Sequence, residues 1–339
     1  MKRRAVIERA IGETRAAVYE GRKLVELHMD RWSTAEAPKI GEVWTGQITS
    51  IDPSLGGAFV SLGTGPDALL AFKAQRDLPR LTEGETVDIT IAKEAIAEKG
   101  PSIRFHGPAT HKKPASVTRL SLTERLSARF PDLAFEETSV GAHDGATDRQ
   151  LAINGGGTVT IERTQALIAI DVDKGSAPQI FECAMKATTL IMTQLRLRGL
   201  GGLIAIDYPN LRQPKQRAAI IRAIEAAADS DPANIRVAPF SRFGVVEMTR
   251  GQDGLSLDAK LNDRFGRPTP ETLAIRAVRQ IEREAKANRG ARLNVVLTPD
   301  LVSALDAQPW DWKEHLTDRI GARFDIAPTG ETFSIGVDR

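Results

Sequence analysis

The sequence contains only one cysteine, Cys183, among its 339 residues. A single thiol excludes an internal disulfide and a zinc site built from thiolates, and it fits a protein of the reducing cytoplasm. On a predicted helix, Cys183 is most simply a small buried apolar residue. The five histidines are scattered without the spacing of metal ligands. Neither residue type therefore enters the predicted chemistry.

Long apolar runs and a large net charge are also missing. The first residues, MKRRAVIERAIGE, are charged and lack the apolar core of a signal peptide, and no segment approaches the length of a membrane helix. We therefore expect a cytoplasmic protein without a membrane partner. The formal net charge is +2, so a surface that binds nucleic acid must be a local basic patch.

Two apolar segments that end abruptly in acids are the most informative feature that is present. Residues 166–173 read ALIAIDVD and residues 203–207 read LIAID, and each predicts a buried strand. About thirty residues separate them, enough for a crossover helix between parallel strands. The carboxyl ends of such strands open on the same edge of the sheet, so Asp171, Asp173 and Asp207 are expected to converge there.

Carboxylates gathered at one edge repel each other unless a cation or bound protons neutralise them. A hard divalent ion such as Mg²⁺ is the simplest solution, and it indicates phosphoryl chemistry. The alternative is that Asp171 and Asp207 only end strands or cap helices, which aspartate commonly does. The pattern by itself does not decide between these two interpretations.

The length allows two or three domains, and contents of 41% hydrophobic and 27% charged residues are typical of a globular protein. We predict an α+β multidomain fold in which an OB-type β-barrel is inserted before an α/β core and a small α/β domain follows at the C-terminus. The predicted units are an N-terminal β-hairpin packing on the core (1–35), the barrel (36–105), a basic connector (106–148), the α/β core that carries the acids (149–250), a linker (251–267) and the small C-terminal domain (268–339).

Three stretches of the core resemble the ribonuclease E/G family: VTIERTQALIAIDVDKG, QLRLRGLGGLIAID and SRFGVVEMTR. The barrel segments ITSIDPSLGGAFVSLG and KEAIAEKG look similar to the RNA-binding OB domain of that family. The resemblance implies an endoribonuclease that hydrolyses single-stranded RNA with magnesium and leaves a 5′ phosphate, in RNA processing or rRNA maturation, with rRNA precursors among the expected partners. Asp171 and Asp207 would hold the ion, with Asp173, where the family usually has asparagine, assisting.

The chain also departs from the family pattern. The paired cysteines of the family's zinc link are absent after SRFGVVEMTR, so a homodimer would form without zinc. The basic connector replaces the family's sensor for a terminal RNA phosphate. Leu69 occupies the second aromatic position of the barrel, and Lys186 and Cys183 stand where an acid and a hydroxyl residue are usual. These departures support an alternative function, a non-catalytic RNA-binding or ribosome-maturation factor that retains the fold.

The expected RNA contacts are basic side chains and one aromatic ring on the barrel and near the acidic edge. They are Phe59, Lys99, Arg196, Arg198, Arg212, Lys215 and Arg242. Each has a structural alternative. On a barrel strand, Phe59 is more often a core residue than a stacking platform. Of Arg196 and Arg198, one is expected to be structural, as a charge that stabilises a helix end. Arg242 is a candidate for an ion pair with Glu247.

Overall fold

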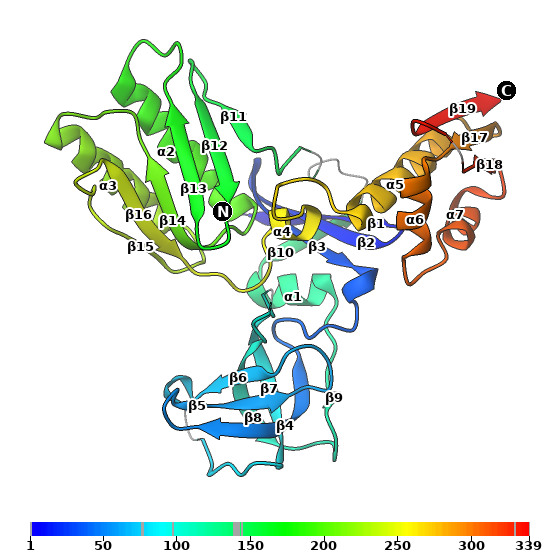
Figure 1. Cartoon of the computed structure of the whole chain (residues 1–339), viewed down its shortest axis with the longest axis horizontal. Coiled ribbons are helices and arrows are strands. Elements are labelled where there is room, and N and C mark those ends of the chain that lie inside the picture. Colours follow the sequence, from blue (N-terminus) through cyan, green and yellow to red (C-terminus); the bar gives the residue numbers. More distant parts are fainter. Residues whose placement is uncertain are drawn as a thin grey trace.

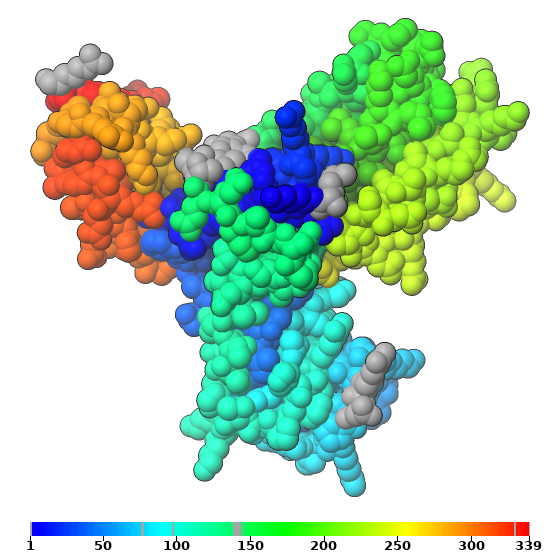
Figure 2. Space-filling view, turned by 180° about the vertical axis from the view of Figure 1, so that it is seen from behind, coloured from blue at the N-terminus to red at the C-terminus, as the bar shows by residue number. Residues whose placement is uncertain are grey.

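The computed structural model describes residues 2–75, 78–96, 98–137, 143, 145–328 and 330–338. Three lobes surround a central sheet: a barrel, an α/β core and a C-terminal unit (Figure 1). Seen from behind, the lobes extend as three arms from a junction that the N-terminal strands and the segment following the barrel build (Figure 2). The architecture is α+β with an OB-type barrel, as the sequence predicts.

The central sheet contains one strand that comes from far along the chain. Its strand order is β10-β1-β2-β3, with β10 parallel to β1 and the other neighbours antiparallel. These strands are β1 (Arg3–Ala10), β2 (Glu13–Glu20), β3 (Lys23–Arg31) and β10 (Leu133–Glu137). The predicted turn at Gly21 is present, but a third and a fourth strand extend the predicted hairpin into a sheet.

Residues 106–148, which the sequence predicts as a connector, are part of this architecture. They contribute β9 (Ala115–Ser116) to the barrel sheet, α1 (Leu122–Arg129) and β10 to the centre. Ser121 begins α1 with a capping box that it forms with Glu124. Leu122 and Leu126 pack α1 onto the apolar face of the central sheet. The segment therefore ties the barrel to the N-terminal strands.

The barrel has five strands and is closed, because its first strand also pairs with its second. Around the barrel the order is β5-β6-β8-β7-β4, and β4 pairs with β5. The strands are β4 (Val43–Asp52), β5 (Gly57–Ser61), β6 (Ala68–Ala71), β7 (Thr86–Lys93) and β8 (Ser102–Pro108). A Cβ at Gly100 would lie 1.9 Å from the Asp67 carbonyl oxygen, so glycine lets the β7–β8 loop pack on the β5–β6 loop.

The α/β core confirms the predicted strand–helix–strand unit. Its strand order is β11-β12-β13-β14-β16-β15, and β13 and β14 are parallel neighbours joined by α2. The buried Ile170 and Ile206 face α2 and α3, whereas none of the described helices covers the opposite face of the sheet (Figure 1). The elements are β11 (Gln150–Ala152), β12 (Thr158–Arg163), β13 (Ile168–Asp173), α2 (Ile180–Leu197), β14 (Gly202–Asp207), α3 (Pro214–Ala228), β15 (Ile235–Val237) and β16 (Val245–Arg250).

The C-terminal unit is a small α/β arrangement that docks on the central sheet. Helix α5 carries the contact, with Arg279 paired to Glu8 at 2.5 Å and Glu271 paired to Arg31 at 2.7 Å. Its elements, after the short α4 (Leu257–Leu261), are α5 (Pro270–Ala287), β17 (Arg292–Val296), α6 (Pro299–Asp306), α7 (Trp312–Ile320), β18 (Phe324–Ala327) and β19 (Ser334–Asp338). No helix in the described ranges has the length and apolarity needed to span a bilayer.

His143 makes folding stability depend on pH. The ring is 3% exposed, and its Nε2 lies 3.0 Å from the His28 carbonyl oxygen. Burial, with the nearby charges of Arg15 and Arg279, lowers the pKa of His143 to about 3. As the pH falls below 6.5, His143 is therefore protonated in the unfolded chain before it is protonated in the folded protein. The contribution of neutral His143 to the free energy of unfolding is complete above pH 6.5 and is lost as the pH falls toward 3.

We expect His143 to reduce the free energy of unfolding by about 1.4 kcal/mol for each pH unit below 6.5. Denaturant titrations at pH 7.5 and 5.0 measure this difference. His143→Gln should remove about 2 kcal/mol of it, since 1.5 pH units of the interval lie below 6.5. His111→Gln, at an exposed position, is the matched control. An unchanged pH difference in His143→Gln would show that other groups cause the acid sensitivity.

Candidate functional site

Asp171 and Asp207 lie side by side at the carboxyl ends of two parallel strands. They are register partners, so their Cα atoms belong to strands that run about 4.8 Å apart. Both side chains are exposed, whereas the preceding Ile170 and Ile206 are buried against the helices. Because side chains alternate along a strand, the two carboxylates share the open face of the sheet. The predicted convergence of these two acids is therefore present in the fold.

Asp173 is placed differently from this pair. It is exposed at the end of β13, beyond the last residue of β14, and its register partner is Thr158 of β12. Its Oδ1 accepts a hydrogen bond of 2.9 Å from the backbone N–H of Gly175. Asp173 thus fixes the turn that leaves β13. Burial, and after it the Asp173 charge, raises the pKa of Cys183, so that thiol stays protonated and packs in the core.

The pair has the donor set of a hard-cation site. Within the part of the chain that the structure describes, neither Asp171 nor Asp207 forms an ion pair, and no three His, Cys, Asp or Glu side chains are grouped to hold a metal. Mg²⁺ commonly binds through one or two carboxylates and takes its other ligands from waters and substrate phosphates. Two unpaired, adjacent carboxylates fit that pattern without a third protein ligand.

Tyr208, directly after Asp207, is structural. Its hydroxyl lies 2.9 Å from Thr188 Oγ1 of α2, and its ring centroid lies 5.7 Å from that of Phe240. Burial raises the pKa of Tyr208 to about 12. The phenol therefore stays protonated at neutral pH and is excluded as a general base.

Exposed basic side chains surround the same edge of the sheet. Arg212 and Lys215 lie in the segment and the first turn of α3 that follow β14, and both are exposed. Arg242 is exposed in the turn before β16, whose Val245 is the register partner of Asp207. Arg242 makes no ion pair with Glu247 in the described residues. These three cations are therefore available to phosphate groups near the acid pair.

Arg196, a predicted RNA contact, is instead part of an ion-pair network that joins α2 to the central sheet. It contacts Glu20 at 2.9 Å and Glu26 at 3.2 Å. Burial raises the pKa of Glu26, but the hydrogen bond to His28 and the charges of His28, Arg129 and Arg196 outweigh it and lower that pKa to about 2. These contacts give Arg196 a structural position.

Arg198 is also structural, since only 1% of its side chain is exposed. Its Nε donates to Gln194 Oε1 at 2.8 Å, its Nη2 donates to the Asp148 carbonyl at 2.9 Å, and its Nη1 lies 3.4 Å from Asp258. A phosphate cannot reach this guanidinium in the observed structure. Both helix-end arginines therefore have structural positions, whereas the sequence predicts this for only one of them.

On the barrel, Phe59 lies outside the apolar core. Its register partner on β6 is Leu69, and both side chains are half-buried, whereas Ala58 and Val60 are fully buried. The exposed Lys99 belongs to the loop that Gly100 packs onto the β5–β6 loop. The ring and the ammonium group therefore occupy the same region of the barrel, as an RNA-binding surface requires.

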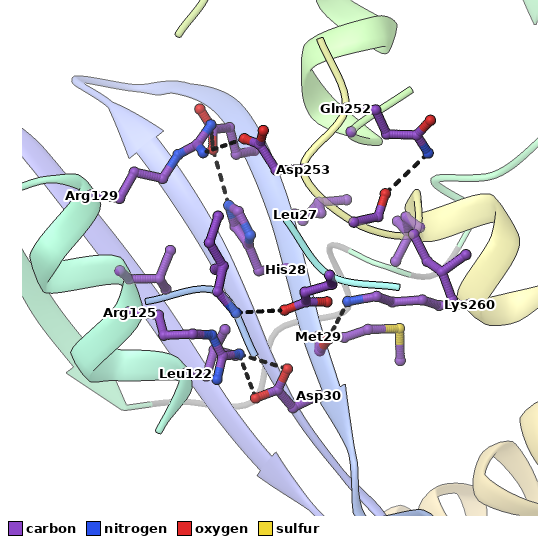
Figure 3. Close-up of a pocket in the computed structure, with 18 of the residues that line it drawn as sticks. Leu27, His28, Met29, Asp30, Leu122, Arg125, Arg129, Gln252, Asp253 and Lys260 are labelled. Atoms are coloured by element: carbon purple, nitrogen blue, oxygen red, sulfur yellow. Dashed lines mark hydrogen bonds and ion pairs between the residues drawn. The ribbon is translucent and has the colours of Figure 1, made fainter. Parts of the chain in front are cut away.

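A cavity of about 390 Å³ lies elsewhere, where β3, α1, the end of α2 and the segment after β16 meet (Figure 3). Its charges are largely satisfied by the protein: Arg125 donates two hydrogen bonds to Asp30, and Lys260 donates to a backbone carbonyl of β3 at 3.0 Å. Burial lowers the pKa of Lys260. Neither Asp171 nor Asp207 lines this cavity, so it belongs to the junction of the units and not to the acid pair.

A closed OB-type barrel beside an α/β core with paired acids and exposed cations at one sheet edge has the construction of a nucleic-acid-processing protein. The model of the ribonuclease E/G family matches residues 86–253, which include the second half of the barrel and the whole α/β core. The resemblance to the ribonuclease E/G family that the sequence predicts is therefore confirmed over residues 86–253. The match includes neither the N-terminal strands nor the C-terminal unit.

Individual relatives agree with this assignment. Ribonuclease G of Escherichia coli K12 is 30% identical over 177 residues, which are 48% of this chain and 36% of that protein. Ribonuclease E of the same strain is 29% identical over 176 residues, 17% of its length. Ribonuclease G of Haemophilus influenzae is 32% identical over 152 residues, 41% of this chain and 31% of that protein. The similarity thus spans about a third or less of these relatives.

Proposed function

We propose that this protein is a magnesium-dependent endoribonuclease that hydrolyses phosphodiester bonds of single-stranded RNA in RNA processing, with rRNA precursors among its substrates. The observation that carries the proposal is the in-register pair of exposed acids, Asp171 and Asp207, within the segment that matches the family. Because the matched relatives are named ribonucleases, RNA is the substrate that best explains this pair and its basic surroundings.

In this proposal Asp171 and Asp207 would hold the cation. A bound Mg²⁺ would supply Lewis-acid polarisation of a phosphoryl oxygen and would offset the repulsion of the two carboxylates. Arg212, Lys215 and Arg242 bind flanking phosphates and fix the strand over the acids. Asp173 keeps the turn after β13 closed beside the pair.

The test is an assay of purified protein with end-labelled single-stranded RNA, with magnesium and with excess chelator. Cleavage that requires the cation and yields 5′-phosphate ends would support the proposal. Tight RNA binding without cleavage across a magnesium titration would favour the non-catalytic RNA-binding factor. Equal cleavage of single-stranded DNA would contradict RNA as the specific substrate.

The barrel is expected to supply affinity through Phe59. Phe59→Ala should weaken RNA binding by about 1–3 kcal/mol, because stacking of one base on an OB-fold aromatic contributes that much. Fluorescence anisotropy with a labelled oligonucleotide measures the change. Leu55→Ala removes an exposed apolar side chain, 54% accessible, from the turn that joins β4 and β5 and should leave affinity unchanged. Equal losses in both variants would argue against stacking at Phe59.

A further inference from the structure

Two turns of this chain have the same Arg-Phe-Gly sequence. The first, residues 242–244, lies between β15 and β16, and the second, residues 264–266, lies between α4 and α5. In both, the glycine has a positive φ, +88° at Gly244 and +78° at Gly266. In both, the glycine N–H donates 3.1 Å to the carbonyl of the residue three positions earlier. Each turn therefore presents its phenylalanine to solvent.

The two rings differ in what covers them. The Phe265 ring is 63% exposed, and two guanidinium groups lie over it, Arg264 at 4.6 Å and Arg267 at 5.1 Å from the centroid. The Phe243 ring is 94% exposed, and no ring or cation of the described residues stacks on it. Phe243 therefore offers open faces to a planar partner, whereas two of the protein's own arginines already contact the Phe265 ring.

The Phe243 turn is fixed beside the acid pair. On one side of the turn, Val245 is the register partner of Asp207. On the other side, the Phe240 ring packs against Tyr208, with centroids 5.7 Å apart. Two residues of chain, at most about 7 Å, connect Val245 to Phe243. The open ring is therefore held next to the carboxyl ends of β13 and β14.

The Phe265 turn lies at the other end of the same strands. The carbonyl of Asp263, which begins this turn, accepts a 3.4 Å hydrogen bond from Arg163 of β12. Arg163 is the register partner of Ile168, the first residue of β13, whereas Asp171 lies near the last. The chain thus contains two turns of the same sequence, of which only one is near the acids.

We propose that Phe243 stacks on a nucleobase of the bound strand and so positions the nucleotide beside the reacting phosphate. The inference rests on the proposed function, since it takes the strand to lie over the acid pair. The exposed cations Arg212 and Lys215 after β14, and Arg242 beside the ring in sequence, favour a polyanion over an apolar protein surface. Every base has a π-face, so the contact serves substrates of different sequence.

The test compares Phe243→Ala with its matched control, Phe265→Ala, and with Phe243→Tyr, which keeps a stacking ring. Binding is measured by anisotropy in an Asp207→Asn background, so that the RNA stays intact. We expect Phe243→Ala to weaken binding about 5- to 150-fold, the effect of one lost base stack, and the other two to stay near the parent. Thermal melting should not change, because the Phe243 side chain is 94% exposed.

The second measurement is the RNA affinity of a series of oligonucleotides that each carry one abasic position. A purely structural role of Phe243 would not change how this affinity depends on the abasic position. In the parent, one position should weaken binding strongly, and in Phe243→Ala that position should lose most of its effect. An unaltered abasic profile, or equal losses in Phe243→Ala and Phe265→Ala, would overturn the inference. A shift in sedimentation instead of RNA affinity would assign the ring to a second copy of the chain and also overturn it.

Cleavage by the wild-type chain is measured separately. Cleavage with an unchanged abasic profile leaves the proposed function standing and removes Phe243 from it. If the chain cleaves none of the RNAs tested but the abasic effect is present, the proposed nuclease activity is excluded. Phe243 would then be the stacking site of an RNA-binding protein.

Discussion

Replacing Asp207 by asparagine is expected to reduce RNA cleavage at least about 100-fold. A catalytic cation contributes several kcal/mol to transition-state stabilisation, and each 1.4 kcal/mol corresponds to a factor of ten in rate. Asparagine keeps the shape of the side chain and removes the charge that attracts the cation. Because Asp207 is exposed and unpaired within the described chain, the fold should be unaffected. Single-turnover cleavage of labelled RNA measures the loss.

The same measurement on Asp171→Asn and on the double variant tests whether the two acids act as one unit. If they hold one cation, the double variant should be hardly slower than either single variant, as for residues that act together. Asp318→Asn, on the exposed side of α7, is the matched control and should retain full activity. Full cleavage by Asp207→Asn would remove the acid pair from the mechanism and would place the cleaving groups elsewhere in the chain.

The acid pair was predictable because its signal is local. Apolar residues run up to Asp171 and Asp207, and parallel strands with a crossover helix must open at a common edge. The position of Asp173 was not predictable, since its hydrogen bond to Gly175 depends on where β13 ends relative to β14. An asparagine can accept the same hydrogen bond, so this turn does not require the extra charge.

The segment 106–148 shows why the rest of the fold could not be predicted from the sequence. Strand β9 has two residues, and β10 pairs with β1 about 130 positions earlier, so no periodicity within the segment indicates either pairing. Arg198 illustrates the same limit for single residues. A charged residue at a helix end usually reaches solvent. Arg198 is buried because it pairs with residues such as Asp258, which is far from it in the sequence.

Phe243 was predictable only in part. It is part of the family motif SRFGVVEMTR, and Ser241 and Gly244 around it are typical turn residues. The sequence therefore indicates a turn but not how exposed its ring is, because Phe265 also lies between an arginine and a glycine and its ring contacts two arginines. Exposure of an aromatic ring depends on what lies around the turn, and only the structure supplies that.

Arg250→Met is expected to have the largest effect on stability, a loss of about 3–5 kcal/mol in the α/β core, since it leaves a buried charge without its partner. Arg250 and Asp231 are 5% and 3% exposed, and their two hydrogen bonds are both 2.9 Å long. Arg250 Nη1 also donates to the Leu200 carbonyl at 2.9 Å. The pair thereby ties the end of β16 to the loops before β14 and β15.

Hydrogen exchange of the β14 and β16 amides measures this loss directly, because it reports local opening in a chain of several units. Arg236→Met, the same substitution at an exposed position of β15, should change protection by less than about 0.5 kcal/mol. Combining Arg250→Met with Asp231→Asn should restore part of the protection, since the second substitution removes the charge that the first leaves unpaired. The double variant could instead lose as much protection as the sum of the two single variants. In that case the hydrogen bond to Leu200 and the packing of Arg250 would stabilise this part of the core, and the pairing with Asp231 would not.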